Sequence, residues 1–251
     1  MRSTTIATAM LWFGAAVAPA WAGTITISDT TFTPGHWNAP SGPARSPWSI
    51  WTTASQTTSA TQSSVSGSPA LVLTHTLRSS GNAGGAIINN TASYTPSASG
   101  AIGTLDYSIS QQWQAPFDLP WRLAIAQNGK YYGTASYHRA YEDGVPSGTY
   151  KTFTGTNLTA ASFAEQLSDF RLDPLSRPDF GPTGSTMYFG LIYLSLTSVP
   201  SGFTWTTYYG RYDVVLRTAS SVPEIDPAGC GAIAAVLAGC GALLERRRMR
   251  G

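Results

Sequence analysis

The fold class is decided by residues 121–134, which read Trp121-Arg122-Leu123-Ala124-Ile125-Ala126-Gln127-Asn128-Gly129-Lys130-Tyr131-Tyr132-Gly133-Thr134. Two runs rich in aliphatic and aromatic residues flank the dipeptide Asn128-Gly129. That dipeptide is the strongest short signal for a β-hairpin, because a two-residue type I′ turn requires positive φ at both positions. The stretch therefore predicts two antiparallel strands, 121–127 and 130–134, joined by a tight turn.

Strand patterns continue on both sides of this hairpin. Apolar and polar residues alternate over 105–110 and 212–217, which predicts strands with one buried face. Residues 186–197 form an uninterrupted apolar and aromatic run, typical of a central strand buried on both faces. Shorter candidates are 24–32, 48–53, 70–77 and 86–89. About ten strands joined by Gly, Pro and Asn turns predict an all-β fold, an antiparallel β-sandwich of jelly-roll-like type.

One segment carries a helical pattern. Thr159 can cap a helix, and Phe163, Leu167 and Phe170 would fall on one face of it. We therefore expect one short helix over 159–170, crossing an edge of the sheet.

The stretch 52–68 differs in composition from the rest of the chain. Eleven of its seventeen residues are Ser or Thr, and no Asp, Glu, Lys or Arg occurs between Arg45 and Arg78. It fits a surface loop or a polar β-hairpin, and Ser/Thr ladders on exposed sheet faces favour the hairpin.

The N-terminus has the three parts of a secretory signal peptide. Arg2 gives a positive start, 6–17 an apolar core, and Ala20-Trp21-Ala22 a small-x-small cleavage site. We expect residues 1–22 to be removed before Gly23. The body, residues 23–221, is then long enough for one domain with its own core.

The body is electrically neutral and contains no cysteine. It has ten Lys or Arg and ten Asp or Glu, so its charge gives no reason to expect a nucleic acid partner. Both cysteines, Cys230 and Cys240, lie in the C-terminal segment, so the body is expected to fold without disulfides.

The C-terminal segment, residues 222–251, has three parts. A polar motif reads Val222-Pro223-Glu224-Ile225-Asp226-Pro227, an apolar run covers 228–244, and a basic end contains Arg246, Arg247, Arg248 and Arg250. As a helix the apolar run would be about 26 Å long, a little short of a typical membrane span. The basic cluster would keep that end in the cytoplasm, with the body outside.

This segment resembles a PEP-CTERM sorting signal. The resemblance covers about thirty residues and departs from the family's Pro-Glu-Pro motif at Ile225, the second proline being Pro227. It implies transient membrane insertion, recognition by an exosortase, cleavage near the motif, and delivery to the cell surface or the extracellular space. Many such proteins accompany exopolysaccharide, which the resemblance makes a candidate partner. It implies nothing about the body's fold or activity.

A search of the body for catalytic motifs predicts no catalytic and no metal site. Its two glutamates, Glu142 and Glu165, do not form the paired carboxylates that glycosidases use, and His36, His75 and His138 lack the spacing of zinc ligands. A polysaccharide lyase remains an alternative through Tyr137-His138-Arg139 and Tyr141. No cofactor is predicted. A structural Ca²⁺ near Asp173 or Asp179 is left open, since no oxygen-ligand loop is evident.

Aromatic residues are the remaining signal, with 26 of them between residues 24 and 221. Exposed rings give sugars a flat apolar surface to stack on, and Trp51, Trp205, Tyr208 and Tyr132 are the candidates for glycan binding. The alternatives are an aromatic-rich core in a purely structural surface protein, or a glycan-active enzyme of lectin-like fold. A turn and strand over 178–190 (Pro178-Asp179-Phe180-Gly181 to Met187-Tyr188-Phe189-Gly190) also resembles concanavalin-like jelly rolls.

Overall fold

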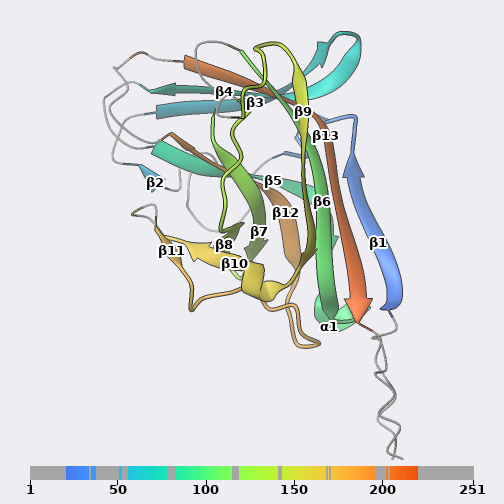
Figure 1. Ribbon diagram of the computed structural model, residues 1–251. Coiled ribbons are helices and arrows are strands. Elements are labelled where there is room, and N and C mark those ends of the chain that lie inside the picture. The colour runs from blue at the N-terminus through green and yellow to red at the C-terminus, as the bar shows by residue number, and fades with distance from the viewer. Residues whose placement is uncertain are drawn as a thin grey trace, which may run out of the picture.

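A computed structural model describes residues 21–33, 35–37, 51–52, 56–77, 83–114, 119–140, 143–167, 169, 171–195, 202 and 204–219. These residues form two antiparallel sheets packed face to face (Figure 1). The predicted antiparallel β-sandwich is therefore confirmed.

The first sheet has six strands. Their order is β3 (Gln56–Val65), β4 (Ser68–Leu77), β13 (Thr204–Ala219), β6 (Ile102–Trp113) and β9 (Tyr150–Leu158), and β1 (Trp21–Asp29) pairs with the second half of β13. The strands nearest to the two ends of the chain thus lie side by side (Figure 1).

The second sheet has seven strands. Their order is β11 (Leu172–Asp173), β10 (Phe163–Gln166), β8 (Lys130–Thr134), β7 (Trp121–Gln127), β12 (Met187–Ser195), β5 (Ala83–Tyr94) and β2 (Trp51–Thr52). The chain crosses between the sheets several times, as in a jelly roll. A single helical turn, α1 (Pro96–Ser99), joins β5 to β6.

The hairpin predicted at Asn128-Gly129 is present, and the Ser/Thr-rich stretch, which fitted either a loop or a hairpin, also contains a hairpin. Asn128 and Gly129 have φ of 53° and 72°, and Ser66 and Gly67 have φ of 52° and 82°. Positive φ at both central residues is the mark of a type I′ turn. The second hairpin is formed by β3 and β4, so the Ser/Thr-rich stretch is ordered sheet.

The core lies between the sheets and is rich in aromatic rings. Trp121 is fully buried and meets the rings of Phe153 and Tyr209 edge-on, at centroid distances of 5.6 and 6.0 Å. The inward residues of the predicted alternating strands, Leu105, Ile109 and Val214 among them, are also fully buried. The central run is confirmed as β12, which lies between β7 and β5.

The helix expected over 159–170 is wrong. Only Ala160–Ser162 form a helical turn, of the 3₁₀ type, and the chain then enters β10. Phe163 pairs with Thr134 of β8 and packs on Phe180, at 5.9 Å between ring centroids. A helix of only twelve residues is marginally stable by itself. Strand pairing and the burial of Phe163 therefore stabilise the strand more than the local pattern stabilises a helix.

The predicted sorting segment, 222–251, lies outside the described residues, as does nearly all of the signal peptide. Trp21 begins β1, but regular pairing with β13 runs from Gly23 onward, after an irregularity between Trp21 and Gly23. Cleavage before Gly23 would therefore leave the regular part of the strand intact.

Candidate functional site

A row of four residues crosses the outer face of the second sheet. Tyr131 of β8 lies opposite Ala126 of β7, Ala126 opposite Tyr188 of β12, and Tyr188 opposite Ser93 of β5. Directly opposed residues of antiparallel strands share a face. Both tyrosines are half-buried, and Ser93 is exposed. With neighbouring strands about 4.8 Å apart, the two tyrosine backbones lie about 10 Å apart, separated by one alanine.

Small residues continue this outer face beyond the tyrosines. The next row contains Gly133, Ala124, Gly190 and Ile88, and the two tyrosines pack against the same apolar cluster as Ala124 and Ile88. Glycine is required at position 190, where a Cβ would lie 2.0 Å from the carbonyl oxygen of Ile87. Ala124 and Ile88 are fully buried, so on this part of the face the solvent-accessible groups are the two half-buried tyrosines and Ser93.

Arg122 lies beyond these rows on the same face. It is 3% exposed, donates from Nη1 to the carbonyl oxygen of Thr134 at 2.9 Å, and lies 3.5 Å from the centre of the Tyr137 ring. Burial lowers the pKa of Arg122 from its ordinary value, and its contact with Tyr137 opposes that shift. Its charge is therefore turned toward protein groups.

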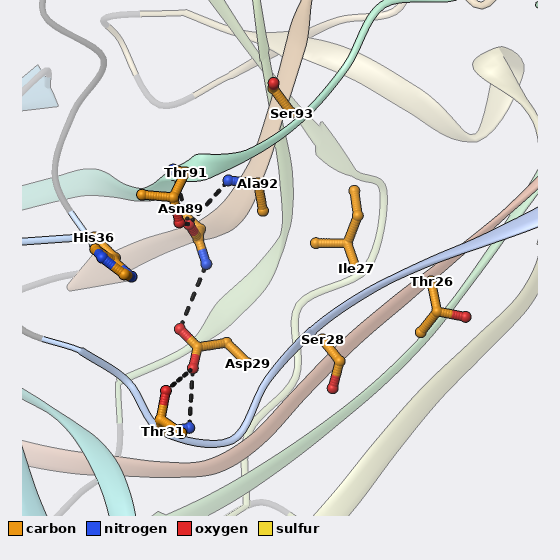
Figure 2. A pocket seen from close by; sticks show the side chains of 10 residues that line it. All are labelled: Thr26, Ile27, Ser28, Asp29, Thr31, His36, Asn89, Thr91, Ala92 and Ser93. Atoms are coloured by element: carbon orange, nitrogen blue, oxygen red, sulfur yellow. Dashed lines mark hydrogen bonds between the residues drawn. The ribbon is translucent and has the colours of Figure 1, made fainter. Parts of the chain in front are cut away.

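Ser93 connects the row to a polar pocket of about 430 Å³ (Figure 2). The pocket lies between β1 of the first sheet and β5 of the second. Its lining is rich in hydroxyl groups, and the polar residues are Thr26, Ser28, Asp29, Thr31, His36, Asn89, Thr91 and Ser93. Its volume falls within the usual range for small-molecule sites.

Asp29 closes one side of the pocket. One carboxylate oxygen accepts hydrogen bonds from the amides of Thr31 and Phe32, at 3.0 and 2.7 Å, and from the Thr31 hydroxyl at 3.2 Å. The other accepts from Trp37 Nε1 at 2.7 Å and from Asn89 Nδ2 at 3.5 Å. Both oxygens thus hold the protein together, and the carboxylate acts as a fixed part of the wall.

Asn89 of β5 repeats this arrangement next to Asp29. Its Oδ1 accepts from the amides of Thr91 and Ala92, at 3.1 and 3.2 Å, and from the Thr91 hydroxyl at 2.9 Å (Figure 2). The bonds stabilise an irregularity in β5, where the register with β12 shifts between Tyr188 and Phe189. Thr91 and Ser93 lie in this irregular part of β5, and both line the pocket.

The residues predicted for glycan binding do not come together. Trp205 and Tyr132 are only 4% and 5% exposed, so the structure places both rings in the core. Tyr208 is half-buried on β13, in the other sheet. Trp51 pairs with Gly84 at the edge of the second sheet, and its side chain lies outside the described features.

The tyrosines of the row were overlooked, although the hairpin carried a signal for one of them. A two-residue turn at 128–129 pairs Tyr131 with Ala126 and Tyr132 with Ile125. Since Trp121, Leu123 and Ile125 form the bulkier face of β7, Tyr132 belongs to the core and Tyr131 to the outer face.

Tyr137 and His138, which the polysaccharide-lyase alternative requires in one site, contact different parts of the protein. The Tyr137 ring covers Arg122, whereas His138 Nε2 lies 2.5 Å from the Tyr107 hydroxyl and the His138 ring packs on Trp121. Burial lowers the pKa of His138 and raises that of Tyr107 to about 12. Tyr141 lies outside the described residues. His138 and Tyr107 are thus a neutral hydrogen-bonded pair inside an aromatic cluster, which indicates a structural role.

No group of three metal-binding side chains lies among the residues that the structure describes. Asp173 and Asp179 accept backbone hydrogen bonds from Leu175 and Gly181, at 2.9 and 2.8 Å, and so stabilise turns. Within the same residues, no helix has the length and apolar character needed to cross a bilayer.

Comparisons with known proteins give low similarities. No protein-family model and no curated protein matches the sequence. Among solved structures, a family 11 carbohydrate-binding module from Clostridium thermocellum, in complex with a β-1,3-1,4-mixed-linked tetrasaccharide, is similar at 13% identity and a TM-score of 0.39. The match covers 78% of this chain and 96% of the module.

A xylan-binding domain of family 22 from Paenibacillus barcinonensis is similar at 13% identity and a TM-score of 0.36, over 81% of this chain and 99% of that one. A family 30 module of a cellulosomal cellulase from Clostridium thermocellum has 10% identity and a TM-score of 0.32, over 78% and 99% of the two chains. At these TM-scores we assign neither a family nor a ligand to this chain from the likeness.

Proposed function

We propose that this protein is an exported, non-enzymatic β-sandwich that binds a glycan on the outer face of its second sheet. The observation that carries the proposal is the row Tyr131, Ala126, Tyr188 and Ser93, which ends at the polar pocket. Two rings separated by a small residue give a sugar chain two stacking surfaces. The pocket then supplies hydroxyl and amide groups for hydrogen bonds to sugar hydroxyls.

The state of the carboxylates supports a non-enzymatic role. Each of the eight Asp and Glu side chains in the described residues accepts a hydrogen bond from another protein group; they are Asp29, Asp106, Asp143, Glu165, Asp169, Asp173, Asp179 and Asp213. Each described carboxylate thus has a structural partner, as expected for a non-enzymatic protein.

The pocket's chemistry favours a neutral glycan. Among the described residues that line it, Asp29 is the one carboxylate and is already bonded on both oxygens, and none of them is Lys or Arg. A uronate-rich polymer would bring negative charges next to Asp29 without a cation to balance them. We therefore expect neutral polysaccharides to bind more tightly than uronate polymers.

The binding test uses the body, residues 23–221, with the producing organism's exopolysaccharide and a glycan array. We expect saturable binding that weakens at least tenfold, about 1.4 kcal/mol, in each of Tyr131→Ala and Tyr188→Ala. Tyr208→Ala is the matched control, because Tyr208 is a half-buried tyrosine of the other sheet. Circular dichroism checks that each variant is folded. Binding lost in Tyr208→Ala but retained in the other two would place the site elsewhere, and no binding by the folded wild-type body would refute it.

Export and sorting are a separate part of the proposal, and the N-terminal and C-terminal segments of the sequence support them. We expect the signal peptide 1–22 to be removed and an exosortase to cut near Pro223-Glu224, releasing the basic end. Intact mass spectrometry of the protein recovered from its native host tests this. A chain outside the membrane fraction that still ends in Arg250-Gly251 would contradict the sorting.

A further inference from the structure

The edge of the first sheet at β3 is longer and more regular than the edges at β11, β2 and β9. β1, which pairs with β13 alone in the described structure, has an irregular register between Trp21 and Gly23. The second sheet ends in β11 and β2, which are two residues long each. At the opposite edge of the first sheet, β9 carries Lys151 and an irregular register with β6. Short strands, lysines and irregularities are the usual devices that stop sheet edges from pairing with other chains.

β3 has none of these devices. It is ten residues long and contains no proline. Its register with β4 runs from Gln56 to Val65 without a shift. The sequence carries no Asp, Glu, Lys or Arg between Arg45 and Arg78, so no such charge on β3 or β4 repels an approaching strand. In the part of the chain that the structure describes, β4 is the one strand paired with β3.

The side chains of β3 suit a second copy of the same strand. Thr61, Gln62, Ser63 and Ser64 are exposed, and none of them is bulky or charged. In an antiparallel self-pairing centred on Thr61, the Thr61 hydroxyl groups of the two copies meet at the two-fold axis, and the backbone of residue 59 lies opposite Ser63. Such pairs of Thr side chains stabilise adjacent strands.

We propose that two copies of this protein join through their β3 edges, antiparallel, into one continuous sheet. Five residues of each ten-residue strand direct an amide and a carbonyl outward, so the pair can form about ten backbone hydrogen bonds. The first sheets of the two copies then become one sheet of double width. The outer face of the second sheet is not part of this contact, and the pairing does not depend on glycan binding.

The first experiment is site-specific cross-linking in the full chain with Cys230→Ser and Cys240→Ser. Single cysteines replace Thr61, Gln62, Ser63 or Ser64, and oxidised glutathione serves as the oxidant. We expect disulfide-linked dimers concentrated at one or two of these positions, because a fixed antiparallel register brings only residues near its centre together. Thr154→Cys is the matched control, an exposed threonine on β9 at the opposite edge of the same sheet. Dimers formed equally at Thr154, or at none of the four positions, would overturn the proposal.

The second experiment measures self-association by analytical ultracentrifugation over a range of concentrations. The double variant Thr61→Lys with Ser63→Lys should raise the dimer dissociation constant at least tenfold, whereas Thr154→Lys should leave it unchanged. A wild-type protein that stays monomeric at the highest concentration, or that dimerises equally well with both lysines in place, would show that β3 does not pair with itself.

Discussion

His75 is a titratable side chain in the middle of the aromatic core. It is 0% exposed and packs between Tyr193 and Trp205, at ring-centroid distances of 5.4 and 5.6 Å. Burial lowers its pKa from 6.5 to about 4. The folded protein therefore holds His75 neutral at pH values where the unfolded chain already binds a proton.

Stability should fall as the pH drops from about 6.5 toward 4, because over this range the unfolded state takes up more protons at His75 than the folded state. At roughly 1.4 kcal/mol per pKa unit, the full effect is roughly 3 kcal/mol. Urea denaturation at pH 7 and pH 4.5 measures it, with His75→Phe as the comparison. That variant keeps an aromatic ring but cannot titrate, so its loss of stability over the same range should be smaller. An equal loss would assign the effect to other groups.

Which aromatic side chains are exposed could not be predicted from residue type. The sequence predicted exposed aromatic rings but named the wrong ones. Trp205 and Tyr132 are core residues, whereas Tyr131 and Tyr188 lie on the outer face. In a strand, adjacent residues point to opposite faces, so identity alone does not decide which ring is exposed. The register with the neighbouring strand does.

At the scale of the elements, two glycines of the second sheet should respond differently to replacement. A Cβ at Gly190 would meet the backbone of β5, with the Ile87 carbonyl oxygen at 2.0 Å, whereas a Cβ at Gly133 would meet the Arg122 side chain at 2.3 Å. Backbone in a paired strand cannot move without breaking the ladder, but a side chain can change rotamer.

We expect Gly190→Ala to lower the free energy of unfolding by at least about 3 kcal/mol or to prevent folding, and Gly133→Ala to cost roughly 1 kcal/mol. Urea denaturation of the two variants measures the difference. Equal losses would mean that the pairing of β12 with β5 is more adaptable than its geometry indicates.

Elements with strong local signals were predicted, and one weak signal failed. The predicted turn at Asn128-Gly129 has the φ values that a hairpin needs, and β12 is the expected buried run. The segment after Thr159 carried a short helical pattern, but it forms β10. As part of a strand, Phe163 is buried and packs against Phe180, which favours the strand over a helix.

For the whole molecule, stability comes from packing and strand pairing without covalent cross-links. The body contains no cysteine. Its thermal unfolding midpoint should therefore be the same with and without a reducing agent, measured by circular dichroism on residues 23–221. A midpoint that falls when the reductant is added would point to a cross-link that this sequence does not provide.

Local patterns in the sequence were enough for the all-β class, the hairpin at Asn128-Gly129, the neutral cysteine-free body and the sorting resemblance of the C-terminal segment. Each depends on neighbours along the chain, through turn chemistry, periodicity and composition. The tertiary structure was needed to show which tyrosines face outward and that Asp29 and Asn89 meet in the lining of one pocket. It also decided that β3 ends its sheet. These features depend on pairing between strands far apart in the chain, such as β1 with β13, which no local pattern specifies.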